Sequence, residues 1–134
     1  MNTAFEATTS GITVRVRVDY LPQHSEPEAG RFFWAYHIAI INQGEETVQL
    51  LRRSWEITDT TGYTQRVNGK GVVGKQPVLR AGEMFEYSSA VPLGIPSGFM
   101  VGTYHMQALP DGRMFDIAVP AFSLDSPFSD PKRH

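Results

Sequence analysis

The sequence predicts an all-β protein, a sandwich or barrel of seven or eight short antiparallel strands. Apolar residues recur mostly with period two, which is typical of strands buried on one face. Turn signals rich in Gly, Pro, Asn and Asp separate these segments at spacings of about ten residues. No segment sustains the period of an amphipathic helix, so a helical fold is not indicated.

The first predicted strand covers residues 12–20. Its alternate positions are apolar or aromatic, and the positions between them are mostly polar or charged. The apolar set is Ile12, Val14, Val16, Val18 and Tyr20. Since successive side chains of a strand point to opposite faces, this strand is expected to bury one face.

The next predicted strand, residues 31–42, is apolar on both parities. This pattern predicts a central strand that is covered on both sides. A helix is the competing interpretation, but the aromatic and β-branched residues favour a strand. Phe32, Trp34 and Tyr36 would then be central packing residues.

The later strands are separated by clear turns. We expect them over residues 47–51, 54–59, 63–67, 83–91, 99–109 and 114–124. Asp59 to Gly62 and Pro110 to Arg113 are the strongest turn sequences. Residues 68–82 contain four glycines and a proline, so most of this stretch is expected to be loop. Pro120 has no N–H for a ladder, which predicts a sheet edge or a bulge there.

Length and composition limit the class of protein. The chain has 134 residues, no cysteine and a net charge of −2. These values fit one domain with an apolar core and exclude disulfides, thiol catalysis and Cys-ligated metals. They do not indicate a globally basic nucleic-acid binder. We expect a flexible N-terminal segment at 1–11, the sandwich domain at 12–124 and a flexible C-terminal tail at 125–134.

The sequence lacks targeting and membrane signals. Residues 1–10 have no basic start followed by an apolar run, so no secretory signal is expected. The longest apolar stretch, residues 32–41, is interrupted by His37 and is far shorter than the ~20 residues of a membrane span. We therefore predict a cytoplasmic protein without membrane contacts.

A glycine motif, G-x-G-x-x-G, lies within the predicted loop. Its glycines are Gly69, Gly71 and Gly74. In a dinucleotide-binding fold this motif joins a strand to a helix that faces pyrophosphate. Here Pro77 follows too early for such a helix, and no βαβ unit surrounds the motif. Glycines that permit left-handed backbone in a loop are one explanation, and an anion nest of loop amides is another.

The charge around this motif keeps the anion nest open. Between Thr60 and Gly82 there are four basic residues and no acidic one. They are Arg66, Lys70, Lys75 and Arg80. A phosphate, a pyrophosphate or the phosphates of a nucleotide would be the natural ligand. The candidate anion-binding residues are Gly69, Lys70, Gly71, Gly74 and Lys75.

Other residues that could carry chemistry do not form a recognisable motif. His37 and His105 lie in predicted strands, and only chance would place both near Asp116; we therefore predict no metal site and no cofactor. No nucleophile elbow, HExxH or P-loop is present, and no catalytic residue can be named. Arg52 to Trp55 is better explained by a core Trp with exposed arginines than by a nucleic-acid patch.

Four segments in order resemble the bacterial ApaG family, also labelled CorD. The segment Leu50 to Asp59 is similar to the family pattern LL-x-R-x-W-x-ITD, in which Arg53 and Trp55 match R-x-W. The other three are Gly69 to Pro77, Gly98 to Met106 and Phe115 to Leu124. Lys70 and Lys75 stand where many members have Glu, so this loop is more basic than usual.

The resemblance implies an antiparallel β-sandwich of the immunoglobulin or fibronectin type III type. Related domains in eukaryotic F-box proteins and in a polymerase-interacting protein suggest a binding role. We therefore expect a non-catalytic interaction module with a protein partner, and a small phosphate-type anion as a second ligand; a homodimer stays open. The alternatives are an enzyme acting on nucleotide polyphosphates and a protein handling cobalt or magnesium, since family members are linked to both.

Overall fold

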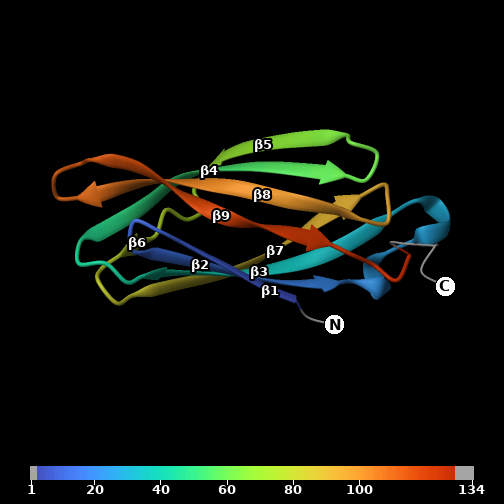
Figure 1. The fold of residues 1–134 in the computed structure, drawn as a ribbon, viewed down its shortest axis with the longest axis horizontal. Coiled ribbons are helices and arrows are strands. Elements are labelled where there is room, and N and C mark those ends of the chain that lie inside the picture. The colour runs from blue at the N-terminus through green and yellow to red at the C-terminus, as the bar shows by residue number, and fades with distance from the viewer. Residues whose placement is uncertain (1–2, 129–134) are drawn as a thin grey trace.

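The structure is a computed structural model that describes residues 3–128, and it confirms the predicted antiparallel sandwich (Figure 1). These residues form nine strands, whereas the sequence predicted seven or eight. One sheet has the strand order β1-β2-β3-β7, and the other has β5-β4-β8-β9, with β6 paired to β4. The strands of the first sheet are β1 (Thr3–Thr9), β2 (Ile12–Tyr20), β3 (Phe32–Asn42) and β7 (Met84–Leu93). Those of the second are β4 (Thr47–Asp59), β5 (Thr64–Lys70), β6 (Val78–Leu79), β8 (Gly98–Leu109) and β9 (Met114–Leu124). Two 3-10 turns, η1 (Pro22–His24) and η2 (Pro27–Ala29), join β2 to β3. Within the described residues, no helix is long and apolar enough to span a membrane.

The predicted alternation of β2 is seen as alternating burial over most of the strand, and β3, which was predicted to be covered on both sides, alternates as well. In β3 the even-numbered residues, among them Phe32, Trp34 and Tyr36, are buried between the sheets. The odd-numbered residues face outward and are only half-buried. β3 is central within its sheet, between β2 and β7, but the prediction that both its faces are covered is wrong. Its second apolar set includes small residues, and the side chains of the two neighbouring strands shield this face in part.

Both ends of the domain extend beyond the predicted limits of 12 and 124. Residues 3–9, which the sequence placed in a flexible segment, form β1 and pair with β2 through the two-residue turn Ser10–Gly11. At the other end, the Trp34 indole donates to the carbonyl of Asp125 at 2.7 Å, and Phe128 packs on Phe32. Positions 1–2 and 129–134 of the two predicted segments lie outside the described residues.

Two bulges set which residues face the core. In β9, Pro120 and Ala121 lie opposite the single residue Val101, so Pro120 is at a bulge on an edge strand, as predicted. In β4, the register against β8 shifts between Leu50 and Arg52, so Leu51 is an extra residue. This insertion explains why the sequence pattern breaks into the segments 47–51 and 54–59, which the structure joins into one strand.

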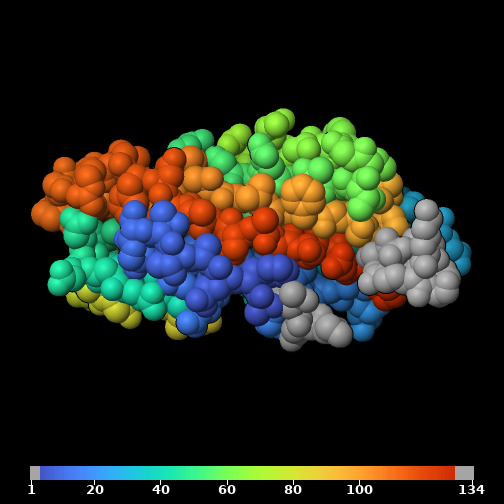
Figure 2. Space-filling model, viewed as in Figure 1, coloured from blue at the N-terminus to red at the C-terminus, as the bar shows by residue number. Residues whose placement is uncertain are grey.

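The two long sides of the sandwich are unlike. On the closed side, β1 and β2 pack against β9, and their atoms adjoin without a gap in Figure 2. The amide of Ala118 donates to Thr9 Oγ1 across this side at 3.3 Å. On the open side, the edge strands are β5 in one sheet and β7 in the other. The segment 71–79, which includes β6, covers part of this side.

Candidate functional site

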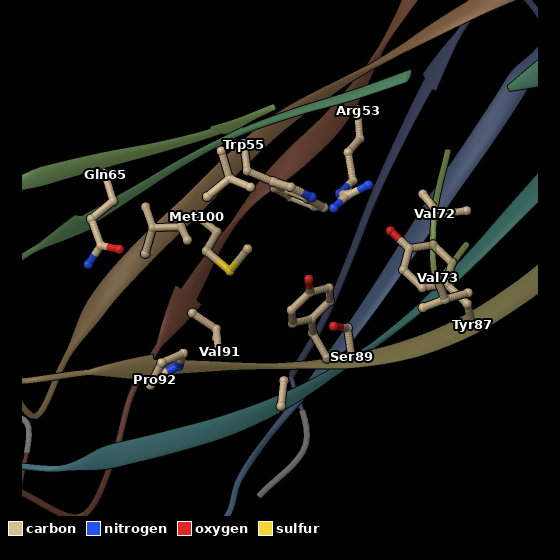
Figure 3. Close-up of a pocket in the computed structure, with 14 residues that line it drawn as sticks. Arg53, Trp55, Gln65, Val72, Val73, Tyr87, Ser89, Val91, Pro92 and Met100 are labelled. Atoms are coloured by element: carbon tan, nitrogen blue, oxygen red, sulfur yellow. The ribbon is translucent and has the colours of Figure 1, made fainter. Parts of the chain in front are cut away.

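A cavity of about 320 Å³ lies on the open side, between β4 and β5 above and β7 below (Figure 3). We call it the open-side cavity. Its walls are mostly apolar and include Trp55, Val67, Val72, Val91 and Met100. The polar groups that line it are Tyr36, Arg53, Gln65, Tyr87 and Ser89. Cavities of this size, with apolar walls and a few polar groups, are typical of ligand sites.

Among the described residues, Arg53 is the one charged residue that lines the open-side cavity. Because the Leu51 bulge shifts the alternation, Arg53 shares the inner face of β4 with Trp55, whereas Arg52 is exposed on the outer face. The Arg53 guanidinium donates through Nη1 to the carbonyls of Gly71 at 2.8 Å and Lys70 at 3.4 Å. Within residues 3–128, no carboxylate lies within 4.0 Å of it.

Each glycine of the G-x-G-x-x-G motif has a separate structural role. Gly69 lies against Arg53, and a Cβ there would come within 2.6 Å of the guanidinium. Gly71 has a φ of +66°, and its Cβ would lie 2.2 Å from the carbonyl of Lys75. Gly74, with a φ of +78°, is the second central residue of a tight turn from Val72 to Lys75. The residues of this turn and Gly71 form what we call the glycine hairpin (residues 71–75).

Val73 occupies the first central position of that turn in a strained conformation. Its φ is +44°, which is a genuine outlier for a β-branched residue. The side chain is 51% exposed and lies at the rim of the open-side cavity, whereas Val72 beside it is fully buried. Strain of this kind concentrates at functional sites, where the surrounding structure holds it in place.

The predicted anion nest has few free amides. The amide of Gly71 donates to the carbonyl of Leu51, and Val72 and Lys75 donate to each other's carbonyls, all within 2.9 Å. The basic residues divide into two pairs. Arg66 bonds to Glu56 and Arg80 bonds to Glu83. Lys70 and Lys75 are exposed, and no described carboxylate is within 4.0 Å of either.

Hydroxyl groups line the floor of the open-side cavity. Tyr87 and Tyr104 share a buried hydrogen bond of 2.6 Å. Burial raises the pKa of both phenols above the ordinary value of 10.0, because it disfavours the phenolate. The hydroxyls of Tyr36 and Ser89 have no hydrogen-bond partner among the described residues. These two groups are therefore free to bond a ligand.

Two polar clusters that the sequence did not predict lie on the outer faces of the sheets. His105 bonds Asp116 through Nδ1 and Ser54 through Nε2, both at 2.8 Å. On the other sheet, His37 bonds Ser88 at 2.6 Å and Asp19 at 3.1 Å. The sequence did hold a signal for the first cluster: counting back from the Pro110 turn places His105 and Asp116 on one face of the hairpin.

The Ser54–His105–Asp116 chain resembles the hydrogen-bond order of a hydrolytic triad. Acyl transfer also needs donors aimed at the developing oxyanion. Ser54 is in a central strand, whose amides lie in the plane of the sheet and pair with β5 and β8. The geometry therefore fits a cross-strand polar ladder better than a nucleophile site. Among residues 3–128, no group of three or more His, Asp or Glu side chains could hold a metal ion.

Comparison with known proteins assigns the chain to a family. The model of the ApaG domain matches residues 22–108. The chain belongs to the ApaG family. ApaG proteins of Rhodospirillum centenum and Paramagnetospirillum magneticum are 56% and 55% identical to it, over 92% and 96% of this chain and 94% and 98% of theirs. The resemblance found in the sequence motifs is thereby confirmed.

A solved structure shares the fold of this chain. A crystal structure titled as an ApaA protein from Bordetella pertussis superposes with a TM-score of 0.83 at 41% identity. The match covers 87% of this chain and 94% of that one. The sandwich is therefore shared with this solved protein over most of both chains.

Proposed function

We propose that this ApaG chain is a non-catalytic binding module that receives an extended segment of a partner protein on its open side. The observation that carries the proposal is the open-side cavity, which lies between two edge strands and contains an arginine without a carboxylate partner. Edge strands offer unpaired backbone groups to a further strand, and pockets beside them select its side chains.

Charge and exposure indicate the chemistry of this partner. Val67 and Val73 are 38% and 51% exposed beside the cavity, which favours apolar contacts. Arg53, Lys70 and Lys75 have no described carboxylate within 4.0 Å, which favours acidic ones. We therefore expect a segment with both apolar and acidic residues. We also propose a cytoplasmic location and a sandwich of the immunoglobulin or fibronectin type III type.

The test starts with affinity capture from lysate of the native host and continues with the purified partner. NMR titration of the labelled chain should move the amides of residues 65–73 and 89–92. Val67→Ser should weaken binding about tenfold. Met114→Ser changes β9, the edge strand on the closed side, and it should leave binding unchanged. A footprint on the closed side or on an outer face contradicts the proposal.

A phosphate-type anion remains a second candidate ligand, because Lys70 precedes the glycine hairpin, Lys75 ends it, and neither has a described carboxylate within 4.0 Å. Titration with inorganic phosphate or pyrophosphate should then shift the amides from Gly69 to Lys75. Hydrolysis of a dinucleoside polyphosphate by the purified chain, abolished by Lys70→Ala, would instead favour the enzyme alternative. Heat released on mixing with cobalt or magnesium ions, and lost on changing His37 or His105, would favour the metal alternative.

A further inference from the structure

We propose that the open-side cavity binds a carboxylate together with a neighbouring branched apolar group, with Arg53 as the cation that holds the carboxylate. This deepens the proposed function and rests on it in one respect: the carboxylate is taken to be an acidic side chain of the partner segment, next to an apolar residue.

The first step of the argument is the state of the Arg53 guanidinium. A guanidinium has five N–H donors in a planar fork. In the described structure only Nη1 donates, and both of its acceptors are backbone carbonyls. An inward-facing charge without an opposite charge is costly, and a carboxylate supplies two acceptors in matching geometry. Nε and Nη2 are the donors that remain for it.

The second step is the choice between a carboxylate and a phosphate. One arginine lines the cavity, so a single negative charge is balanced and a dianion is not. The rest of the wall is largely apolar, including Val67, Val91 and Met100. The free hydroxyls of Tyr36 and Ser89 add donors opposite the strand that carries Arg53, and Figure 3 shows Ser89 on the far wall from Arg53.

The third step concerns size and access. A cavity of about 320 Å³ is at the lower end of the range for small-molecule sites, so it suits a group the size of an amino acid. Val73 and Val67 are exposed at its rim, where a branched side chain can pack on them. A ligand group can therefore enter from solvent without separation of the two sheets.

The experiment is an NMR titration of the labelled chain with N-acetyl-L-leucine and, separately, with its neutral amide. We expect N-acetyl-L-leucine to shift the backbone amides of Val67, Gly69, Val73 and Ser89. It should bind at least tenfold more tightly than its neutral amide. The Arg53→Gln variant should bind N-acetyl-L-leucine only as weakly as it binds the neutral amide. Arg52→Gln removes the same charge one residue away on the outer face, and it should change nothing. Equal binding of acid and amide, or equal loss in both variants, overturns the proposal.

A second pair of variants leaves Arg53 in place, in case Arg53→Gln does not fold. Ser89→Asp adds a carboxylate inside the cavity, and it should pair with Arg53 and block the acid. Ser88→Asp adds the same charge on the outer face of β7, and acid binding should persist. Undiminished binding to the Ser89→Asp variant overturns the proposal, as does inorganic phosphate that displaces the acid at equal or lower concentration.

Two further arms identify the source of the carboxylate. The peptides acetyl-Leu-Glu-Leu-amide and acetyl-Leu-Gln-Leu-amide differ only in the internal charge. Tenfold tighter binding of the Glu peptide supports a partner segment. Binding of N-acetyl-leucine alone supports the carboxylate site and overturns the segment as its occupant. A partner footprint away from the cavity, with acid binding intact, overturns the proposed function but not the carboxylate site.

Discussion

The closed and open sides of this sandwich solve the same packing problem differently. On the closed side Phe122 of β9 lies between Phe5 and Trp55, with ring centroids 6.2 and 6.0 Å away. On the open side the corresponding space between the sheets contains a cavity and an arginine. We infer that the closed side supplies most of the stability between the sheets, whereas the open side keeps groups available for a ligand.

Truncation of one side chain on each side gives the largest expected contrast. Phe122→Ala removes a ring that is 1% exposed and should lower the free energy of unfolding by about 3–5 kcal/mol. Val67→Ala removes methyl groups that are already 38% exposed, and it should cost less than about 1 kcal/mol. Urea unfolding measures both. Similar losses in the two variants would break the comparison.

Alkaline pH should destabilise the floor of the open-side cavity. Burial raises the pKa of Tyr87 and of Tyr104, so each folded phenol keeps its proton where the unfolded chain has lost it. Their contribution is therefore complete below about pH 10 and is lost as the pH rises further, by up to about 1.4 kcal/mol per pH unit for each group.

Tyr87→Phe should remove one of these two contributions and flatten the pH dependence above about pH 10. Its cost at neutral pH is the shared hydrogen bond with Tyr104, about 1–2 kcal/mol. Tyr63→Phe is the control, since Tyr63 is an exposed phenol in the same chain. Thermal melts between pH 8 and 11 measure the slopes, and equal slopes in the wild type and the Tyr87→Phe variant would refute the assignment.

Relief of strain at the rim should stabilise the chain while it weakens the site. Val73→Asn replaces a β-branched residue at positive φ with one that tolerates this conformation, for a gain of up to about 1 kcal/mol. The same change removes an apolar contact beside the cavity, so affinity for N-acetyl-leucine should fall. Thermal unfolding measures the change in stability, and an NMR titration of the same sample measures the affinity. A loss of stability would show that the valine is not strained.

The smallest effect is expected on the outer faces, which belong to neither side. Ser54→Ala breaks the hydrogen bond to His105 at a partly exposed position, and it should cost about 0.5 kcal/mol. Binding at the open-side cavity should not change. An activated-ester assay checks the other interpretation of this cluster, since hydrolysis that disappears in this variant would make Ser54 a nucleophile.

Much of the fold could be predicted from the spacing of apolar and turn residues along the chain. The site could not, because it depends on contacts between residues that are far apart in the sequence. Period two predicted most of the strands, and the missing N–H of Pro120 predicted a sheet edge or a bulge, both of which are present. β1 was missed because its alternation is weak, although Ser10–Gly11 is a good hairpin turn. The role of Gly69 could not be predicted, because the residue that a Cβ at this position would contact is Arg53 on the neighbouring strand.

The bulge at Leu51 changes which residues of β4 face the core. Upstream the even-numbered residues face the core, and downstream the odd-numbered ones do, so one inserted residue chooses between two adjacent arginines. A strand that kept Leu51 but paired without the bulge would present Arg52 to the cavity and send Trp55 toward solvent. The bulge thus decides which of the two arginines faces the cavity. A sequence alignment that places a gap on the wrong side of Leu51 would compare residues that lie on opposite faces of the sheet.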